Sequence, residues 1–398
     1  MSANPVNAWD ARLLAASETA FGTPAVPANV AAYAALAVEY VKAEMGPAEV
    51  GNTRAKKDRN LGRGMTAGFV EGRVAPFPWA VELAVKSRSA IDADPREVAL
   101  YKAAGLKKTV NAGVSCVLSP SATPIESGDF VSATLTRLLG ASPATYESEV
   151  LRGCLTRTLR WEGGDKELYL KAAGVGIAKG LTGGLDSVTL TIGATSLTCT
   201  AEESYRLAGL GYFLCESEVI QVTACAAGGT TATIARGALG TAAAAHTAKA
   251  FQPLAPTGIT FSGAPLAEAT TTASIGGVSA RVLNWYFELT TGMDALPGET
   301  GSKYTQGAKY GRYDAKLGMR LILSGDQVSL LGKATARPTV AVALSQGVGV
   351  GGVWSLSAPY CEVVPFVVPD ATNDVAIVDV SFRLRDNAAN DMFAITLT

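Results

Sequence analysis

The feature that most constrains this sequence is a strand–loop–strand pattern that occurs twice. In residues 34–88 an apolar run (AALAVEYVKAEM) precedes a polar, glycine-rich loop and a second run of strand character. Residues 282–325 repeat this order, from VLNWYFELTTGM through a similar loop to AKLGMRLILSG. Apolar Val81, Leu83 and Val85 alternate with other residues, which is the pattern of a half-buried strand.

The similarity between the two stretches continues downstream. A hairpin (GCLTRTLRW, then LYLKAAGV) follows in the first copy, and CEVVPFVV, then VAIVDVSFRLR, follows in the second. Each hairpin opens at a cysteine, Cys154 or Cys361. We interpret the pattern as an internal duplication of one β-rich unit. The alternative is that any two antiparallel segments look alike at this level of identity.

Composition excludes several classes of protein. The chain has 398 residues, of which 17% are charged, and a net charge of −1, so neither disorder nor bulk attraction to nucleic acid or an anionic membrane is expected. No apolar run approaches 18 residues and the N-terminus lacks a signal-peptide layout, so we expect a soluble protein that is not exported by the usual route and has no membrane partner. The six cysteines form no CxxC pair, and we expect them to be reduced and buried.

The sequence has few of the residues and motifs that catalysis usually requires. His246 is the single histidine, and histidine is the usual general base and a common metal ligand. The chain has no GxSxG, HExxH, Walker loop or GxGxxG after a strand. The neighbouring carboxylates at 202–203 and at 216 and 218 are interpreted as solvated. We therefore predict no enzyme activity, no catalytic or metal residues and no cofactor.

Four regions are predicted along the chain. Residues 1–33 contain Pro24 and Pro27 and are predicted to form an N-terminal arm. Two similar β-sandwich units are expected at 34–180 and 256–398, each with one short helix. Between them, 181–255 is predicted to be a small, outward-facing all-β module. The fold class is thus mainly β.

The clearest predicted helix covers 94–106, with Asp94 as its cap, Pro95 at its first position and Gly105 at its end. The segment 325–335 is predicted to be its shorter counterpart in the second copy. Strands are expected at 109–119 and 129–139, and a hairpin at 150–175.

The loop at 46–64 is rich in basic residues and has three interpretations. It could bind nucleic acid, although no interleaved aromatic residue is available to stack on bases. It could be a solvated hairpin tip. It could also reach the acidic edge of another subunit, since loops of this length are usually functional or disordered.

Two motifs carry a resemblance to a known family. The opening SETAFGTPAVPAN resembles the start of tail-tube (major tail) proteins of long-tailed bacteriophages, and the order of strand, long loop, strand, capped helix and hairpin is similar to theirs. The segment SEVIQVTA…TATIARGALGTAAAAH resembles a small β module found across phage structural proteins, in which E-x-x-x-V-T, R-G-x-x-G-T and a histidine recur. The family's acidic channel has no clear counterpart in this near-neutral chain.

The resemblance implies two tail-tube-type units and a structural role in a siphophage virion. Subunits would join edge to edge into rings, and the rings would stack into a conduit for DNA ejection. Such a protein is made and assembled in the host cytoplasm and resides in the virion tail. Its partners would be itself, the tape-measure protein, double-stranded DNA passing through the channel, and the tail terminator and tail-tip proteins.

The duplication favours a homotrimer with pseudo-sixfold symmetry over a homohexamer. Polar strand faces would line the channel, so that DNA phosphates slide rather than stick. The candidate channel-lining residues are Glu39, Glu71, Glu82 and Asp379. The candidate inter-ring contacts are Arg54, Lys56, Lys57, Arg59 and Arg63 in the first loop, and Glu299, Lys303, Tyr304 and Lys309 in the second.

Two other classes of function compete with the tube. The first is a tail decoration or receptor- and carbohydrate-binding β-sandwich protein, which would present clustered aromatic residues on a loop; only 7% of residues are aromatic, most of them in expected strands. The second is a glycosidase using two carboxylates, which the missing motifs argue against.

Overall fold

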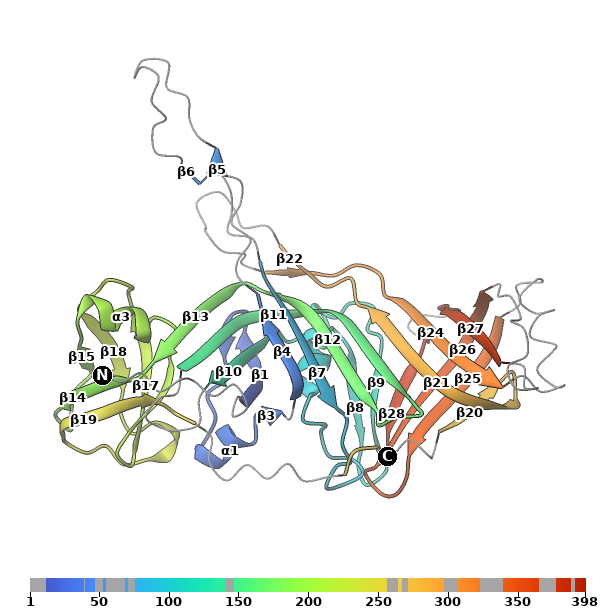
Figure 1. Ribbon diagram of the computed structural model, residues 1–398, viewed down its shortest axis with the longest axis horizontal. Coiled ribbons are helices and arrows are strands. Elements are labelled where there is room, and N and C mark those ends of the chain that lie inside the picture. The colour runs from blue at the N-terminus through green and yellow to red at the C-terminus, as the bar shows by residue number, and fades with distance from the viewer. Residues whose placement is uncertain are drawn as a thin grey trace, which may run out of the picture.

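The computed structural model describes residues 12–38, 40–46, 53–54, 69–70, 76–139, 147–255, 264–266, 271–296, 307–322, 339–364, 377–387 and 391–398. The prediction of a mainly β fold is confirmed. Three groups of strands lie in a row (Figure 1): a small module at one end, a first barrel in the middle and a second barrel at the other end.

The first barrel is a closed circuit of antiparallel strands. Hydrogen-bonded pairs run in the order β1, β10, β11, β12, β7 and β4, and β3, which precedes β4 in the chain, returns to β1. Its strands are β1 (Arg12–Ala20), β3 (Ala37–Val38), β4 (Tyr40–Met45), β7 (Phe77–Ala84), β10 (Ala133–Leu139), β11 (Glu147–Gly164) and β12 (Tyr169–Gly176).

The second barrel repeats this circuit. Pairs run in the order β20, β25, β26, β27, β24 and β21, and β21 returns to β20. Its strands are β20 (Thr272–Ile275), β21 (Val278–Thr290), β24 (Asp314–Ile322), β25 (Thr339–Gly347), β26 (Val353–Val364) and β27 (Ile377–Leu384). The position of each strand in the chain matches that of its counterpart, so the interpretation of a duplicated unit has a structural basis.

Smaller elements are repeated as well. A strand that follows each barrel pairs with the first half of an equivalent long strand: β13 (Ala178–Gly183) with β11, and β28 (Ala394–Leu397) with β26. Each long loop carries a two-residue ladder: β5 (Thr53–Arg54) with β6 (Phe69–Val70), and β22 (Asp294–Ala295) with β23 (Ala308–Lys309).

A single apolar core runs through both barrels. Alternation along β7 buries Trp79, Val81 and Leu83, and β25 and β27 also bury every second residue. Trp161 of the first barrel stacks on Phe287 of the second, with ring centroids 5.4 Å apart. The described cysteines are free thiols, and all but Cys225 are buried.

The module has its own sheet and core. Its six strands pair in the order β14, β19, β16, β17, β18 and β15, and a capping box of Thr200 and Glu203 begins its helix α3. The elements are β14 (Leu185–Leu190), β15 (Ser196–Thr198), α3 (Ala201–Leu207), β16 (Gly211–Cys215), β17 (Glu218–Cys225), β18 (Thr231–Ala235), the 3₁₀ turn η3 (Ala238–Gly240) and β19 (His246–Pro253). The predicted boundary at residue 181 falls inside β13, which pairs with β11, so the separate sheet starts at Leu185.

The predicted N-terminal arm requires correction. Residues 12–20 form β1, because the apolar run from Leu13 to Ala16 is buried in the sheet. The prolines lie in and after the short β2 (Thr23–Pro24), and the chain then forms helix α1 (Val30–Ala34), which Asn29 caps. The first strand predicted at 34–45 is consequently shortened to β3 and β4.

The helix predicted at 94–106 is shorter than expected. Helix α2 spans Val98–Ala103, and Glu97 at its N-cap makes no side-chain capping bond. Asp94 does not cap it because the helix begins only at Val98, and both oxygens of the Asp94 carboxylate accept hydrogen bonds of 2.6 Å from Lys108 instead. Gly105, with φ of +73°, does end the helical turn. The counterpart predicted at 325–335 lies outside the described residues.

The strand predicted at 109–119 is a hairpin. It consists of β8 (Lys107–Asn111) and β9 (Ser115–Ser119), and Gly113 occupies the turn with φ of +65°. Strand β9 also pairs with β28 of the second barrel. The hairpin therefore ties the two barrels together.

Candidate channel face

One continuous sheet crosses both barrels. Thr158–Gly164 of β11 pair antiparallel with Asn284–Thr290 of β21, in register with Thr158 opposite Thr290. This seam joins two runs of strands into the order β4, β7, β12, β11, β21, β24 and β27. Side chains on alternate positions of all seven strands share the face that points away from the core.

That face carries a row of charged residues that lie opposite one another across the strands. In each pair of neighbouring strands from β4 to β27, the register places one residue of the row directly opposite the next. The row consists of Lys42, Glu82, Lys171, Arg160, Glu288, Lys316 and Arg383. Part of it, from β4 to β21, is hollowed into a shallow cavity. We call the outward side of this seven-stranded sheet the channel face.

The charges at the seam are paired. Arg160 of β11 donates a hydrogen bond of 3.0 Å to Glu288 of β21 and one of 2.7 Å to Glu162. Its guanidinium also lies 4.2 Å from the ring centroid of Tyr286. Lys171 donates to Glu162 at 2.8 Å and lies 3.9 Å from Glu82. The seam thus has a cation that contacts both barrels.

These contacts shift the ionisation of the seam residues. Burial by itself would raise the pKa of Glu162, but the hydrogen bonds and charges of Lys171 and Arg160 outweigh it and hold that pKa below its usual range. Burial by itself would lower the pKa of Arg160, and Glu288 and Glu162 raise it instead. Both groups are therefore charged at neutral pH.

Two of the predicted channel-lining residues lie on this face. Glu82 is half-buried in the row, and Asp379 of β27 is exposed beside Arg320, at 4.0 Å. The other two, Glu39 and Glu71, lie outside the described residues. The expectation of an acidic or neutral lining is not met in this row, because its members are Glu82 and Glu288 among five basic side chains. The strand alternation in RWE (160–162) was the signal that could have identified the seam residues.

The predicted inter-ring residues fall mostly outside the described part of the chain. Arg54 belongs to the ladder strand β5, and Lys309 of β23 lies 3.8 Å from Asp294. The others cannot be placed: Lys56, Lys57, Arg59, Arg63, Glu299, Lys303 and Tyr304 lie outside the described residues.

A second cluster of charged residues lies in the module. It brings together the glutamate, arginine and histidine of the motif SEVIQVTA…TATIARGALGTAAAAH. Glu218, which has no solvent exposure, accepts two hydrogen bonds from Arg236, at 2.8 and 2.7 Å, and one of 2.8 Å from Nε2 of His246. The backbone N–H groups of Gly237 and Ala244 donate to the same carboxylate. The interpretation of this carboxylate as solvated was wrong, because five donors converge on it.

The cluster holds the loop between β18 and β19. Burial by itself would raise the pKa of Glu218, but Arg236, the two backbone donors and His246 lower it to about 2. Gly237 adopts a φ of +60°, which lets the chain turn back over the carboxylate. His246 also contacts Glu216, at 2.9 Å from Nδ1, and Lys249 contacts the same Glu216 at 2.6 Å.

No family model matches the chain, and no curated protein matches it. In the part of the chain that the structure describes, no helix is long and apolar enough to cross a membrane. The described histidine, cysteine and carboxylate side chains also form no group that could hold a metal ion.

Proposed function

We propose that the protein is a structural subunit that assembles into stacked rings, which form a hollow tail tube for phage DNA. The observation that carries this proposal is the β11–β21 seam, in which two copies of one barrel are joined edge to edge within a single chain. A seam that joins the two barrels of one chain can also join barrels of neighbouring chains.

A comparison of the two barrels indicates which strand edges could pair with a neighbouring chain. Strand β21 has β24 on one edge and β11 on the other. Its counterpart β4 pairs with β7, and its other edge has no partner strand among the described residues. The counterpart of β11 is β26, whose described part ends at Val364. Within one chain the end of β11 pairs with β21. By analogy, the end of β26 in one chain would pair with β4 of the next chain.

Head-to-tail contacts of this kind give a ring if the rotation closes. Each chain contributes two barrels, so three chains would place six barrels around the channel. Closure would also cover the edge of β4, and exposed sheet edges otherwise favour aggregation. A ring of six chains is the alternative stoichiometry.

The channel face suits a conduit because the cations at its seam are paired with carboxylates. Arg160 and Lys171 are bound to carboxylates of the same face. Cations that are already paired bind DNA phosphates less strongly than free ones, since phosphate neutralisation drives most non-specific DNA binding. DNA and the tape-measure protein would then pass along the channel without strong attachment.

Electron microscopy of the purified protein tests the proposal, with end-on views classified by rotational symmetry. Hollow tubes with threefold symmetry and six similar inner lobes support both the tube and the duplicated ring. Sixfold tubes keep the function and reject the trimer. If only isolated particles form at every concentration and salt tested, the tube is rejected and a decoration or receptor-binding role is favoured.

An edge variant makes the test specific. Val41 lies at the register shift of β4 and is 61% exposed. Val41→Asp should prevent assembly while leaving thermal unfolding of the free chain unchanged. The matched control is Ile192→Asp in the module, where the side chain is 64% exposed. Equal assembly of both variants would exclude β4 as the contact edge.

A further inference from the structure

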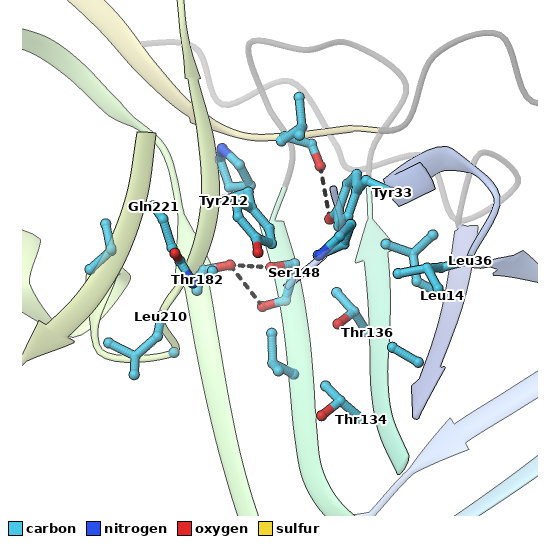
Figure 2. Close-up of a pocket in the computed structure, with 18 of the residues that line it drawn as sticks. Leu14, Tyr33, Leu36, Thr134, Thr136, Ser148, Thr182, Leu210, Tyr212 and Gln221 are labelled. Carbon is cyan, nitrogen blue, oxygen red and sulfur yellow. Dashed lines mark hydrogen bonds between the residues drawn. The ribbon is translucent and has the colours of Figure 1, made fainter. Parts of the chain in front are cut away.

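A cavity of about 230 Å³ lies between the first barrel and the module (Figure 2). Its floor is the outer face of β1, β10, β11 and β13, where alternation presents Thr136, Ser148 and Arg152. Its roof comes from the segment around Tyr33 and from the module strands β16 and β17. Most of the lining is apolar: Leu14, Leu36, Leu138, Val150, Leu210 and Leu254.

Several polar groups face this cavity without a partner. The Tyr212 hydroxyl, the Gln221 amide and the Thr136 hydroxyl make no hydrogen bond to any described residue, although each side chain is at least half-buried. Figure 2 shows Tyr212 directed toward the floor, where the hydroxyls of Ser148 and Thr182 bond to each other. Each of these three side chains is partly exposed and is available to form a hydrogen bond with a polar occupant at this end of the cavity.

Arg152 gives the cavity a charge. Its Nη2 donates a hydrogen bond of 2.6 Å to the carbonyl oxygen of Gly209, and no carboxylate of the described residues forms an ion pair with it. Burial lowers its pKa, and the charge of Glu18 partly opposes that effect. Glu18 is itself held by other donors, among them the Gly153 N–H at 2.8 Å and the Thr134 hydroxyl at 2.7 Å. The guanidinium therefore has donors left for an anion.

We propose that this cavity binds a small carboxylic acid with an apolar body, whose carboxylate pairs with Arg152 and whose body contacts the leucine-lined wall. Tyr212 and Gln221 supply further hydrogen bonds to the carboxylate. A cavity of about 150 Å³ holds benzene, so this larger one has room for a body of roughly six carbons plus the head group. Val26 lines the cavity and is 67% exposed, which places an opening at that residue.

The test compares ligands that differ only in their head group. Isothermal titration calorimetry with sodium hexanoate and with 1-hexanol, on the full-length protein, should show hexanoate binding about tenfold more tightly, a typical gain for one charge-assisted hydrogen-bonded pair. Equal affinity for the two ligands would overturn the role of Arg152. Absence of saturable hexanoate binding would overturn the site.

Variants then test whether Arg152 is the residue that binds the carboxylate head group. Arg152→Gln should weaken hexanoate binding about tenfold, to the level of 1-hexanol, and leave 1-hexanol binding unchanged. The matched control is Arg206→Gln, because this exposed module arginine also donates to a backbone carbonyl, that of Gly184. A folded Arg152→Gln variant with unchanged hexanoate affinity rejects the proposal. If that variant does not fold, the ligand comparison on the unaltered protein decides.

Discussion

The side-chain oxygen of Gln346 accepts a hydrogen bond of 3.0 Å from the backbone N–H of Gly164, and this contact joins the two barrels. Gln346 has no solvent exposure. The same oxygen accepts a bond of 3.1 Å from the Trp285 indole, and its amide nitrogen donates to the carbonyl of Lys166 at 3.0 Å. A single buried amide thus satisfies groups at the end of the β11–β21 seam that water cannot reach.

Replacing this amide should weaken the fold. In Gln346→Leu the N–H groups of Gly164 and Trp285 would lose their acceptor while remaining buried, which costs about 1–3 kcal/mol for each such group. We expect a lower midpoint in urea, followed by tryptophan fluorescence, because Trp161, Trp285 and Trp354 all lie in the shared core. Gln252→Leu is the control, since Gln252 is half-buried and makes no side-chain hydrogen bond to a described residue. Equal midpoints for the two variants would show that the amide does not stabilise the seam.

The Glu218 cluster predicts acid sensitivity of the module. The folded pKa of Glu218, about 2, lies below the ordinary value of 4.5. Its contribution to stability is therefore fully present above pH 4.5 and is lost as pH falls from 4.5 toward 2. Residues 185–253 contain no tryptophan, so hydrogen exchange of β16–β19, corrected for intrinsic rates, is the suitable measurement.

Glu218→Gln separates this contribution from general acid effects. The variant should lose protection in the module at neutral pH, because the buried Arg236 keeps its charge without a partner, a change of about 3–5 kcal/mol. Between pH 4.5 and 2 it should lose less protection than the unaltered protein. Glu216→Gln, at an exposed carboxylate that contacts the same histidine, should behave like the unaltered protein. A pH dependence of Glu218→Gln identical to that of the unaltered protein would reject this assignment.

The mainly β fold could be predicted from the sequence because strand alternation is a local signal. Val81, Leu83 and Val85 were expected to be buried together, and all three are. The order of strands around each long loop was also recognisable without any contact information. The pairing of β11 with β21 was not predictable in register, since it depends on which edges meet across 120 residues or more.

The sequence-based predictions were wrong where a residue's environment depends on contacts with residues further along the chain. Asp94 has the sequence context of a helix cap, but the helix begins only at Val98 and the Asp94 carboxylate contacts Lys108 instead. Glu218 resembles a solvated strand residue, but Arg236 and His246 come from further along the chain to bury it. The run from Leu13 to Ala16 is too short to identify a strand from sequence, and only the pairing of β1 with β10 buries Leu13 in the shared core and Leu14 in a second cluster on the opposite face.

The charge pair across the seam should contribute a small, measurable coupling. A double-mutant cycle with Arg160→Gln and Glu288→Gln should give about 0.5–1 kcal/mol, because both side chains are about one-third exposed. The coupling should fall as salt is raised. The exposed pair Lys42–Glu44, within one strand, is the control and should show no measurable coupling. A coupling at the seam no larger than that of this control would mean that backbone pairing alone holds the barrels together.

The basic loop predicts a change in ring stacking. Reversing Lys56, Lys57 and Arg59 to glutamate should shorten or abolish tubes without lowering the unfolding temperature, because the loop would then repel the acidic edge that it is proposed to contact. The control has the same change in net charge at exposed positions elsewhere: Lys107→Glu, Arg206→Glu and Arg281→Glu. Tube lengths are measured by electron microscopy at equal protein concentration over a series of salt concentrations. Short tubes that lengthen with salt in the loop variant alone would support the contact, since added salt screens the introduced repulsion. Equal tube lengths in both variants would remove the loop from the stacking interface.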